Sequence, residues 1–171
     1  MEYGSKMLQL HKACTCMIDI IATIPPNINF TLDKLYTISE NDTIGERIRK
    51  LRKLKDMTTK ELGEKIGITS AGIINYENNN AYPSAPIILK LYTLLSKNIA
   101  CDDYSNFIIS KYWEKLKEWR INNKLTQKDA ATFLQVAERT YYSWEKCNSY
   151  ITRHTFNKIK NKLIQLTTKE P

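Results

Sequence analysis

The residues of this sequence best suited to covalent or metal chemistry are its four cysteines and two histidines. Cys14 and Cys16 lie near His11 and would form a metal trio, but incidental thiols are the expected interpretation because no CxxC pair or zinc-finger spacing occurs. The sequence also has no phosphate-binding loop, no catalytic pair of carboxylates and no Ser-His-Asp ordering. We therefore expect no enzyme activity, no metal and no cofactor.

Binding of a polyanion is a second kind of chemistry, and it needs clustered positive charge. The chain carries 26 Lys and Arg against 18 Asp and Glu, which gives a formal net charge of +8. Residues 1–42 carry a net charge of −2, residues 43–96 of +4 and residues 97–171 of +6. This distribution favours a nucleic-acid partner for the last two regions. The lack of a disulfide framework and of a membrane-spanning apolar run predicts a cytoplasmic protein with no membrane partner.

The two basic regions contain the same pattern twice, in register and 68 residues apart. A repeat of this kind decides the architecture before any helix is assigned. The corresponding positions include Arg52 and Arg120, Thr58 and Thr126, Thr59 and Gln127, Ile66 and Leu134, Ile73 and Tyr141, Tyr76 and Trp144, and Glu77 and Glu145.

Apolar spacing and capping residues predict short helices throughout both copies and no strand, so the expected fold class is all-α. In the first copy the expected helices span residues 43–54, 59–66, 69–78 and 86–95. In the second copy a first helix is expected to end at residue 122, and three more to span residues 127–134, 138–146 and 153–166. Between them, Asp102 and Asp103 resemble a cap, which predicts a continuous helix over residues 104–119. Tyr76, Trp113, Trp119, Phe133 and Trp144 are expected in the core.

These boundaries divide the chain into an N-terminal extension of unknown function (1–42), a first domain (43–96), a connector that could be helical (97–110) and a second domain (111–168). The extension has an apolar helical stripe between residues 6 and 21. Such a stripe needs a partner, and three remain open: one of the repeats, a second chain in a homodimer, or another protein.

Both copies resemble the helix-turn-helix family of phage repressors, Cro-like proteins and xenobiotic-response-element regulators. In the first copy the matching residues are Ile44 to Ile48, Leu62, Gly67-Ile68-Thr69 and Tyr76-Glu77. In the second they are Leu125-Thr126-Gln127, Ala131, Val136, Arg139-Thr140 and Trp144-Glu145. The resemblance implies two tandem five-helix domains of the lambda-repressor type, each placing one helix in the major groove of double-stranded DNA.

The resemblance also implies which residues contact DNA. In the second copy these are Gln127 at the start of one helix, and Glu138, Arg139, Thr140, Tyr142 and Ser143 on the next. Arg139 can offer two donors to guanine, and Thr140 can contact a phosphate or a thymine methyl. In the first copy the candidates are Thr59, Ser70, Ala71 and Asn75, with Arg47 and Lys50 on phosphates. This copy offers few donors, so it binds with little sequence preference or not at all.

Two arginines are better explained by structure than by base reading. Arg52 with Glu77, and Arg120 with Glu145, occupy positions where the family forms an ion pair between the first and third helices. Removing one partner of such a pair costs about 3 kcal/mol because the other charge is left alone.

The leading hypothesis is a sequence-specific transcriptional regulator of prokaryotic or phage type that binds two different half-sites. The alternative is a protein-binding inhibitor or antitoxin, for example of the anti-CRISPR type, that uses the same scaffold and represses its own promoter. The weak donors of the first copy and the apolar extension favour a protein partner for those parts.

Overall fold

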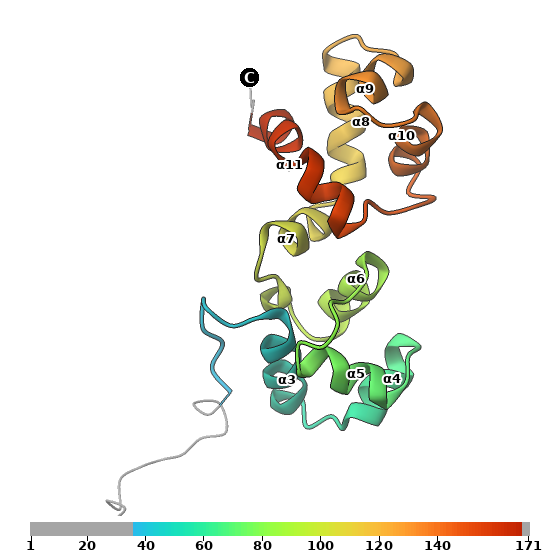
Figure 1. Ribbon diagram of the computed structural model, residues 1–171. Coiled ribbons are helices and arrows are strands. Elements are labelled where there is room, and N and C mark those ends of the chain that lie inside the picture. Colours follow the sequence, from blue (N-terminus) through green and yellow to red (C-terminus); the bar gives the residue numbers. More distant parts are fainter. Residues whose placement is uncertain (1–35, 169–171) are drawn as a thin grey trace, which may run out of the picture. The chain divides into compact units, whose positions relative to one another are not determined.

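The computed structural model describes residues 36–168, with side chains described up to residue 163. The apolar stripe expected between residues 6 and 21 lies outside this range. All regular structure in the described range is helical, which confirms the all-α prediction (Figure 1). In chain order the elements are α3 (Ile44–Leu54), α4 (Thr59–Ile66), α5 (Ser70–Glu77), α6 (Ala85–Leu94), the 3-10 helix η1 (Lys97–Ile99), α7 (Asp103–Ile109), α8 (Tyr112–Asn122), α9 (Gln127–Leu134), α10 (Glu138–Glu145) and α11 (Arg153–Thr168).

We call α3–α6 the first helix set and α8–α11 the second helix set. Each of these stretches, 44–94 and 112–168, holds four α-helices, one fewer than the five expected per domain. The first three helices of the two sets have the same lengths, namely 11, 8 and 8 residues. The helices therefore repeat in register, as the sequence does.

Side-chain caps mark the starts of α4 and α9. The Thr58 hydroxyl accepts a hydrogen bond from the Glu61 amide at 3.1 Å, and the Glu61 carboxylate accepts one from the Thr58 amide at 2.7 Å. Thr126 and Asp129 form the same capping box at the start of α9. These hydrogen bonds hold the pKa of Glu61 and of Asp129 below their usual values. Two backbone donors at each helix start are thereby satisfied.

A left-handed residue ends the second helix of each set and turns the chain into the third. Gly67 follows α4 with a φ of 79°, and Gln135 follows α9 with a φ of 58°. Glycine adopts this conformation without a steric penalty, whereas a residue with a Cβ is less suited to it. The turn that positions α5 and α10 is therefore the same in both sets, although only one of them uses glycine.

Buried aliphatic residues form the centre of the first helix set, and larger aromatic residues replace several of them in the second. Ile48, Leu62 and Ile73 are fully buried. Tyr141, at the position that corresponds to Ile73, is also fully buried, and its hydroxyl donates to the Leu116 carbonyl at 3.1 Å. The hydrogen bond satisfies a polar atom that burial would otherwise leave unpaired.

The connector is partly helical, but the continuous helix predicted over residues 104–119 is wrong. The helix α7 ends at Ile109, and Lys111 takes a left-handed φ of 54° before α8 begins. The break allows Phe107 to stack on Tyr112, with ring centroids 4.6 Å apart. Aromatic stacking of this kind adds about 0.5–1.5 kcal/mol beyond burial.

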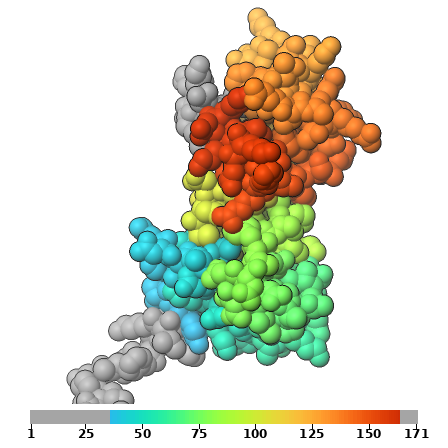
Figure 2. Space-filling view, viewed as in Figure 1, coloured from blue at the N-terminus to red at the C-terminus, as the bar shows by residue number. Residues whose placement is uncertain are grey.

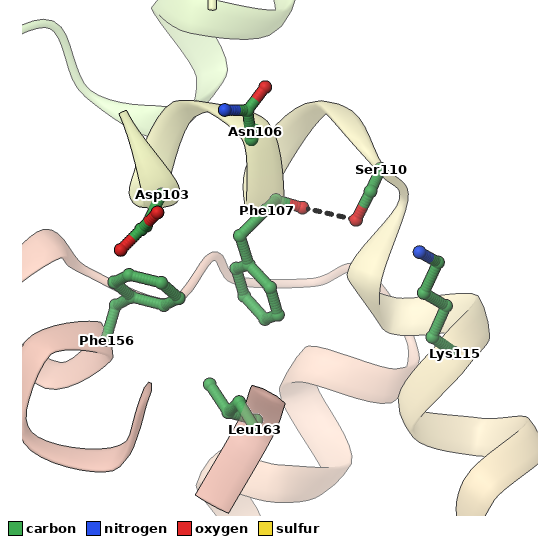
Figure 3. Close-up of a pocket in the computed structure, with 7 residues that line it drawn as sticks. All are labelled: Asp103, Asn106, Phe107, Ser110, Lys115, Phe156 and Leu163. Atoms are coloured by element: carbon green, nitrogen blue, oxygen red, sulfur yellow. Dashed lines mark hydrogen bonds between the residues drawn. The ribbon is translucent and has the colours of Figure 1, made fainter. Parts of the chain in front are cut away.

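A pocket of about 250 Å³ opens beside this aromatic cluster (Figure 3). Phe107 of α7 and Phe156 and Leu163 of α11 provide its apolar lining. The Ser110 hydroxyl at its edge donates to the Phe107 carbonyl at 2.9 Å, so this polar group serves the end of α7. Asp103 and Asn106 of α7 and Lys115 of α8 also line the pocket, so it lies among α7, α8 and α11 and has a mixed polar and apolar lining.

Two glycines in the first helix set provide a test of its packing. A Cβ on Gly45 would clash with the backbone carbonyl of Tyr76, whereas a Cβ on Gly72 would meet only ordinary contacts, at 3.4 Å from Ile68 Cδ1. We expect Gly45→Ala to lower the free energy of unfolding by about 1–3 kcal/mol through overpacking between α3 and α5. Gly72→Ala, the matched control, should raise it by about 0.5–1 kcal/mol. Urea unfolding followed by circular dichroism measures both, and equal effects of the two substitutions would contradict the packing of α3 on α5.

Candidate nucleic-acid interface

The exposed side of α10 carries the strongest base-reading candidate. Arg139 is exposed on the first turn, and Tyr142 and Ser143 follow it three and four residues later on the same side. Tyr142 is 44% exposed, whereas Tyr141 is buried and anchors the opposite side. Glu138 is exposed and Thr140 and Ser143 are half-buried. In the space-filling view the orange segment that contains α10 lies at the surface (Figure 2).

Gln127, at the start of α9, is held in place by a hydrogen bond to a buried carboxylate of the protein itself. Its side-chain amide donates to Glu145 Oε2 at 2.8 Å, and Gln127 is half-buried. This contact ties the N-terminus of α9 to the end of α10. One amide hydrogen of Gln127 is thereby occupied, so the side chain is fixed in position and its contribution to DNA binding is limited to its remaining groups.

In the first helix set the corresponding positions are poor in donors. The hydroxyls of Thr59 and Ser70 lie 2.8 Å apart and hydrogen-bond to each other. Ala71 and Asn75 are exposed, and so is Ile74, which is 44% exposed. The exposure of Ile74 was not predicted from the sequence, although Tyr142, the residue 68 positions later, was among the expected DNA contacts.

The structure corrects the assignment of Arg47 to phosphates. Arg47 is only 9% exposed, and its guanidinium donates to backbone carbonyls of Ser39, Glu40, Asp42, Asn98 and Ala100. These carbonyls belong to the loops before α3 and around η1, and a buried carbonyl without a donor would destabilise the fold. Arg47 therefore does not lie on the candidate surface.

Lys50 is likewise engaged by the protein itself. Its ammonium lies 2.8 Å from both Asp42 carboxylate oxygens and donates to the Thr37 carbonyl at 3.1 Å. The hydrogen bond from Lys50 holds the pKa of Asp42 below its usual value. Lys50 is only partly exposed, so its charge is largely balanced before any DNA approaches.

Both internal ion pairs expected from the sequence are present. Arg52 Nε lies 2.6 Å from Glu77 Oε1, and both side chains are nearly buried. Arg120 Nε lies 2.6 Å from Glu145 Oε1, and the Arg120 guanidinium also donates to the Leu125 carbonyl at 3.2 Å. Each pair joins the first helix of its set to the third, so it fixes the helix that carries the exposed candidates.

Burial and hydrogen bonding oppose each other at Glu145. Burial alone would raise its pKa, but the hydrogen bonds from Arg120 and Gln127 oppose this effect, and the pKa lies below the usual value. The carboxylate is therefore charged at neutral pH and stabilises the folded state.

Residues 45–97 match the helix-turn-helix domain. The matched residues run from α3 through η1 and so contain α4, the turn at Gly67 and α5. The match supports a DNA-binding helix-turn-helix regulator. No curated protein and no solved structure matches the chain.

The match lies on the first helix set, which has the fewer exposed donors. The second helix set lies outside it, so its status as a second copy stays a prediction. Within residues 36–168 no helix combines the length and apolar character needed to cross a membrane. The same part of the chain holds no group of three His, Cys, Asp or Glu residues placed to share a metal ion.

The first ion pair predicts a large effect from a small change. Glu77→Gln keeps the shape of the side chain but leaves the Arg52 charge buried, so the free energy of unfolding should fall by about 3 kcal/mol. Glu114→Gln, at an exposed pair whose atoms lie 3.7 Å apart, should change it by less than about 0.5 kcal/mol. Urea unfolding at pH 7 compares the two. Similar losses in both variants would refute the structural role of Arg52 and Glu77.

The second ion pair predicts a dependence on pH. Because the folded-state pKa of Glu145 is lowered, its stabilisation is complete above its unfolded value of about 4.5 and is lost as the pH falls through the folded value. The stability difference between the parent and Glu145→Gln should therefore be largest at pH 6–7 and shrink below about pH 4.5. Urea midpoints measured across this range test the expectation, and a difference that does not change with pH would contradict it.

Proposed function

We propose that this protein is a sequence-specific transcriptional regulator of the repressor type, from a prokaryote or a phage. The observation that carries the proposal is the helix-turn-helix match over residues 45–97, which includes α4 and α5. A helix of this motif fits the major groove, and its first turns reach the base edges. The exposed side of α5 supports this orientation for the first helix set.

We further propose that the second helix set is a second DNA-binding copy with the stronger base contacts. Its support is the repeated order of helices at the same spacing and the exposed guanidinium of Arg139 on the first turn of α10. Arginine can donate two hydrogen bonds to guanine in the major groove. Tyr142 and Ser143 lie on the same side and are placed for contacts with the DNA backbone.

Two copies with different exposed residues would bind two different half-sites. Helix-turn-helix units commonly read half-sites about 34–36 Å apart, one turn of DNA. Because α5 exposes Ala71 where α10 exposes Arg139, the combined site should lack two-fold symmetry. A symmetric operator would instead require a homodimer of the whole chain.

Binding selection from random double-stranded DNA with the full chain tests the proposal. The expected result is an enriched, asymmetric sequence that the purified chain then binds at least a thousandfold more tightly than a scrambled duplex. Recovery of unenriched DNA at every round, with binding that depends only on salt, would mean that the chain does not read sequence.

A pair of variants separates base reading from phosphate binding. Arg139→Ala should weaken binding to the selected duplex by about 1–3 kcal/mol and relax the preference at one base pair. Lys128→Ala, at an exposed position on the first turn of α9, should weaken binding to all duplexes alike and reduce the salt slope by about one. Fluorescence anisotropy with base-pair variants of the duplex measures both effects. If Arg139→Ala keeps the parent's preference at every position, another residue reads the bases.

A further inference from the structure

The exposed side of α5 lacks the groups that usually recognise guanine. Residues 66–89 contain no Lys or Arg, and the single acidic residue among them, Glu77, is buried in its ion pair. The Ser70 hydroxyl is hydrogen-bonded to Thr59. Of the groove-facing candidates in this helix, Asn75 alone presents a side-chain donor. A helix with this surface would leave most donors and acceptors of a G·C pair without partners.

The same side of α5 presents apolar groups instead. Ala71 and Ile74 lie three residues apart, one turn of helix, and both are exposed. Ile74 exposes 44% of its surface, although most isoleucines in the described residues of this set are buried. The fold therefore leaves one large aliphatic side chain beside Asn75 and pointing to solvent.

Gly72 lacks a side chain, so the helix backbone is more accessible at this position. The fold does not require a glycine here. A Cβ at Gly72 would meet its nearest neighbours at 3.4–3.8 Å, which is ordinary van der Waals contact. Glycine within a helix costs about 1 kcal/mol relative to alanine. Packing within the protein therefore does not explain this glycine. A close approach of the helix backbone to another molecule would explain it.

We infer that α5 reads A·T base pairs, with Ala71 and Ile74 in contact with thymine C5-methyl groups and Asn75 hydrogen-bonded to adenine. The thymine methyl is the apolar group that the major groove presents, and alanine and other apolar side chains recognise it by contact. Asparagine pairs with the N6 and N7 atoms of adenine. This inference rests on the proposed function and adds the base composition of one half-site.

The second helix set offers a matched control for the proposed recognition of thymine methyl groups. Tyr142 corresponds to Ile74 in the repeat and is equally exposed, at 44%. Arg139, which corresponds to Ala71, carries a charge and two possible donors. The two helices thus present opposite chemistry at corresponding positions, so an effect on thymine methyl recognition should map to α5 alone.

The test uses the full chain and the duplex obtained by selection from random DNA. Each thymine is replaced in turn by deoxyuridine, which removes the C5-methyl group and leaves the base pairing intact. We expect one or two substitutions to weaken binding about fourfold each, the effect of losing one buried methyl. Fluorescence anisotropy at fixed salt gives the ratio of the dissociation constants for the uracil and thymine duplexes.

The Ile74→Ala variant then assigns the effect to α5. At the thymine that Ile74 contacts, the uracil-to-thymine ratio should fall from about four toward one because most of the apolar side chain is gone, whereas a thymine contacted by Ala71 should keep its ratio. Tyr142→Ala should keep the ratio near four even if its overall affinity is lower. Circular dichroism and thermal melting establish that both variants fold as the parent does, which is expected because both side chains are exposed.

The outcomes distinguish this inference from the function on which it rests. If the chain enriches no sequence, both fall. If it binds a selected duplex but every uracil substitution changes affinity less than 1.5-fold, the inference is overturned and the regulator remains. If Ile74→Ala keeps the parent's ratio at every sensitive thymine, Ile74 does not contact a thymine methyl and the inference is overturned.

Discussion

An ion pair between an arginine of the first helix and a buried glutamate of the third is the interaction on which each helix set depends. The helices involved are short, at eight to eleven residues, and helices of this length are not stable alone in water. Arg52 and Glu77 hold α5 against α3, and Arg120 and Glu145 hold α10 against α8. In the second set the same carboxylate also accepts from Gln127, so one buried charge orders three helices. The exposed residues on α5 and α10 owe their positions to these pairs.

The two helix sets use one framework for two kinds of surface. In the core, an aliphatic residue of one set can correspond to an aromatic residue of the other, as Ile73 corresponds to Tyr141. The helices of the two sets nevertheless have the same order and spacing. Outside, α10 presents a guanidinium while α5 presents methyl groups and one amide. The buried framework and the exposed side chains of the two sets therefore vary independently of each other.

Much of the fold could be predicted because local signals were strong. The helices predicted over residues 59–66 and 127–134 coincide with α4 and α9 at both ends. The break before α8 could not be predicted, because a lysine in the left-handed region has no sequence signature and only the packing of Phe107 on Tyr112 explains it. Phe133, expected in the core, is 44% exposed.

The candidate site was harder to predict than the fold. From the sequence, Arg47 is expected to be an exposed charge on a basic helix. Its burial depends on five backbone carbonyls that accept hydrogen bonds from its guanidinium, and the sequence does not reveal these contacts. By residue type Ile74 is expected in the core, because isoleucine is among the side chains most often buried. Its repeat partner Tyr142 was the available signal, since corresponding positions in a repeat face the same way.

The buried position of Arg47 also has a consequence for dissecting the chain. Two of its acceptors, the carbonyls of Asn98 and Ala100, follow α6, and two others, those of Ser39 and Glu40, precede α3. A fragment limited to residues 43–96 would lack all four carbonyls. The buried guanidinium of Arg47 would then lose these hydrogen-bond acceptors, which destabilises the fold. A fragment that keeps these partners of Arg47 must therefore extend beyond the helices of the first set, at least from residue 39 to residue 100.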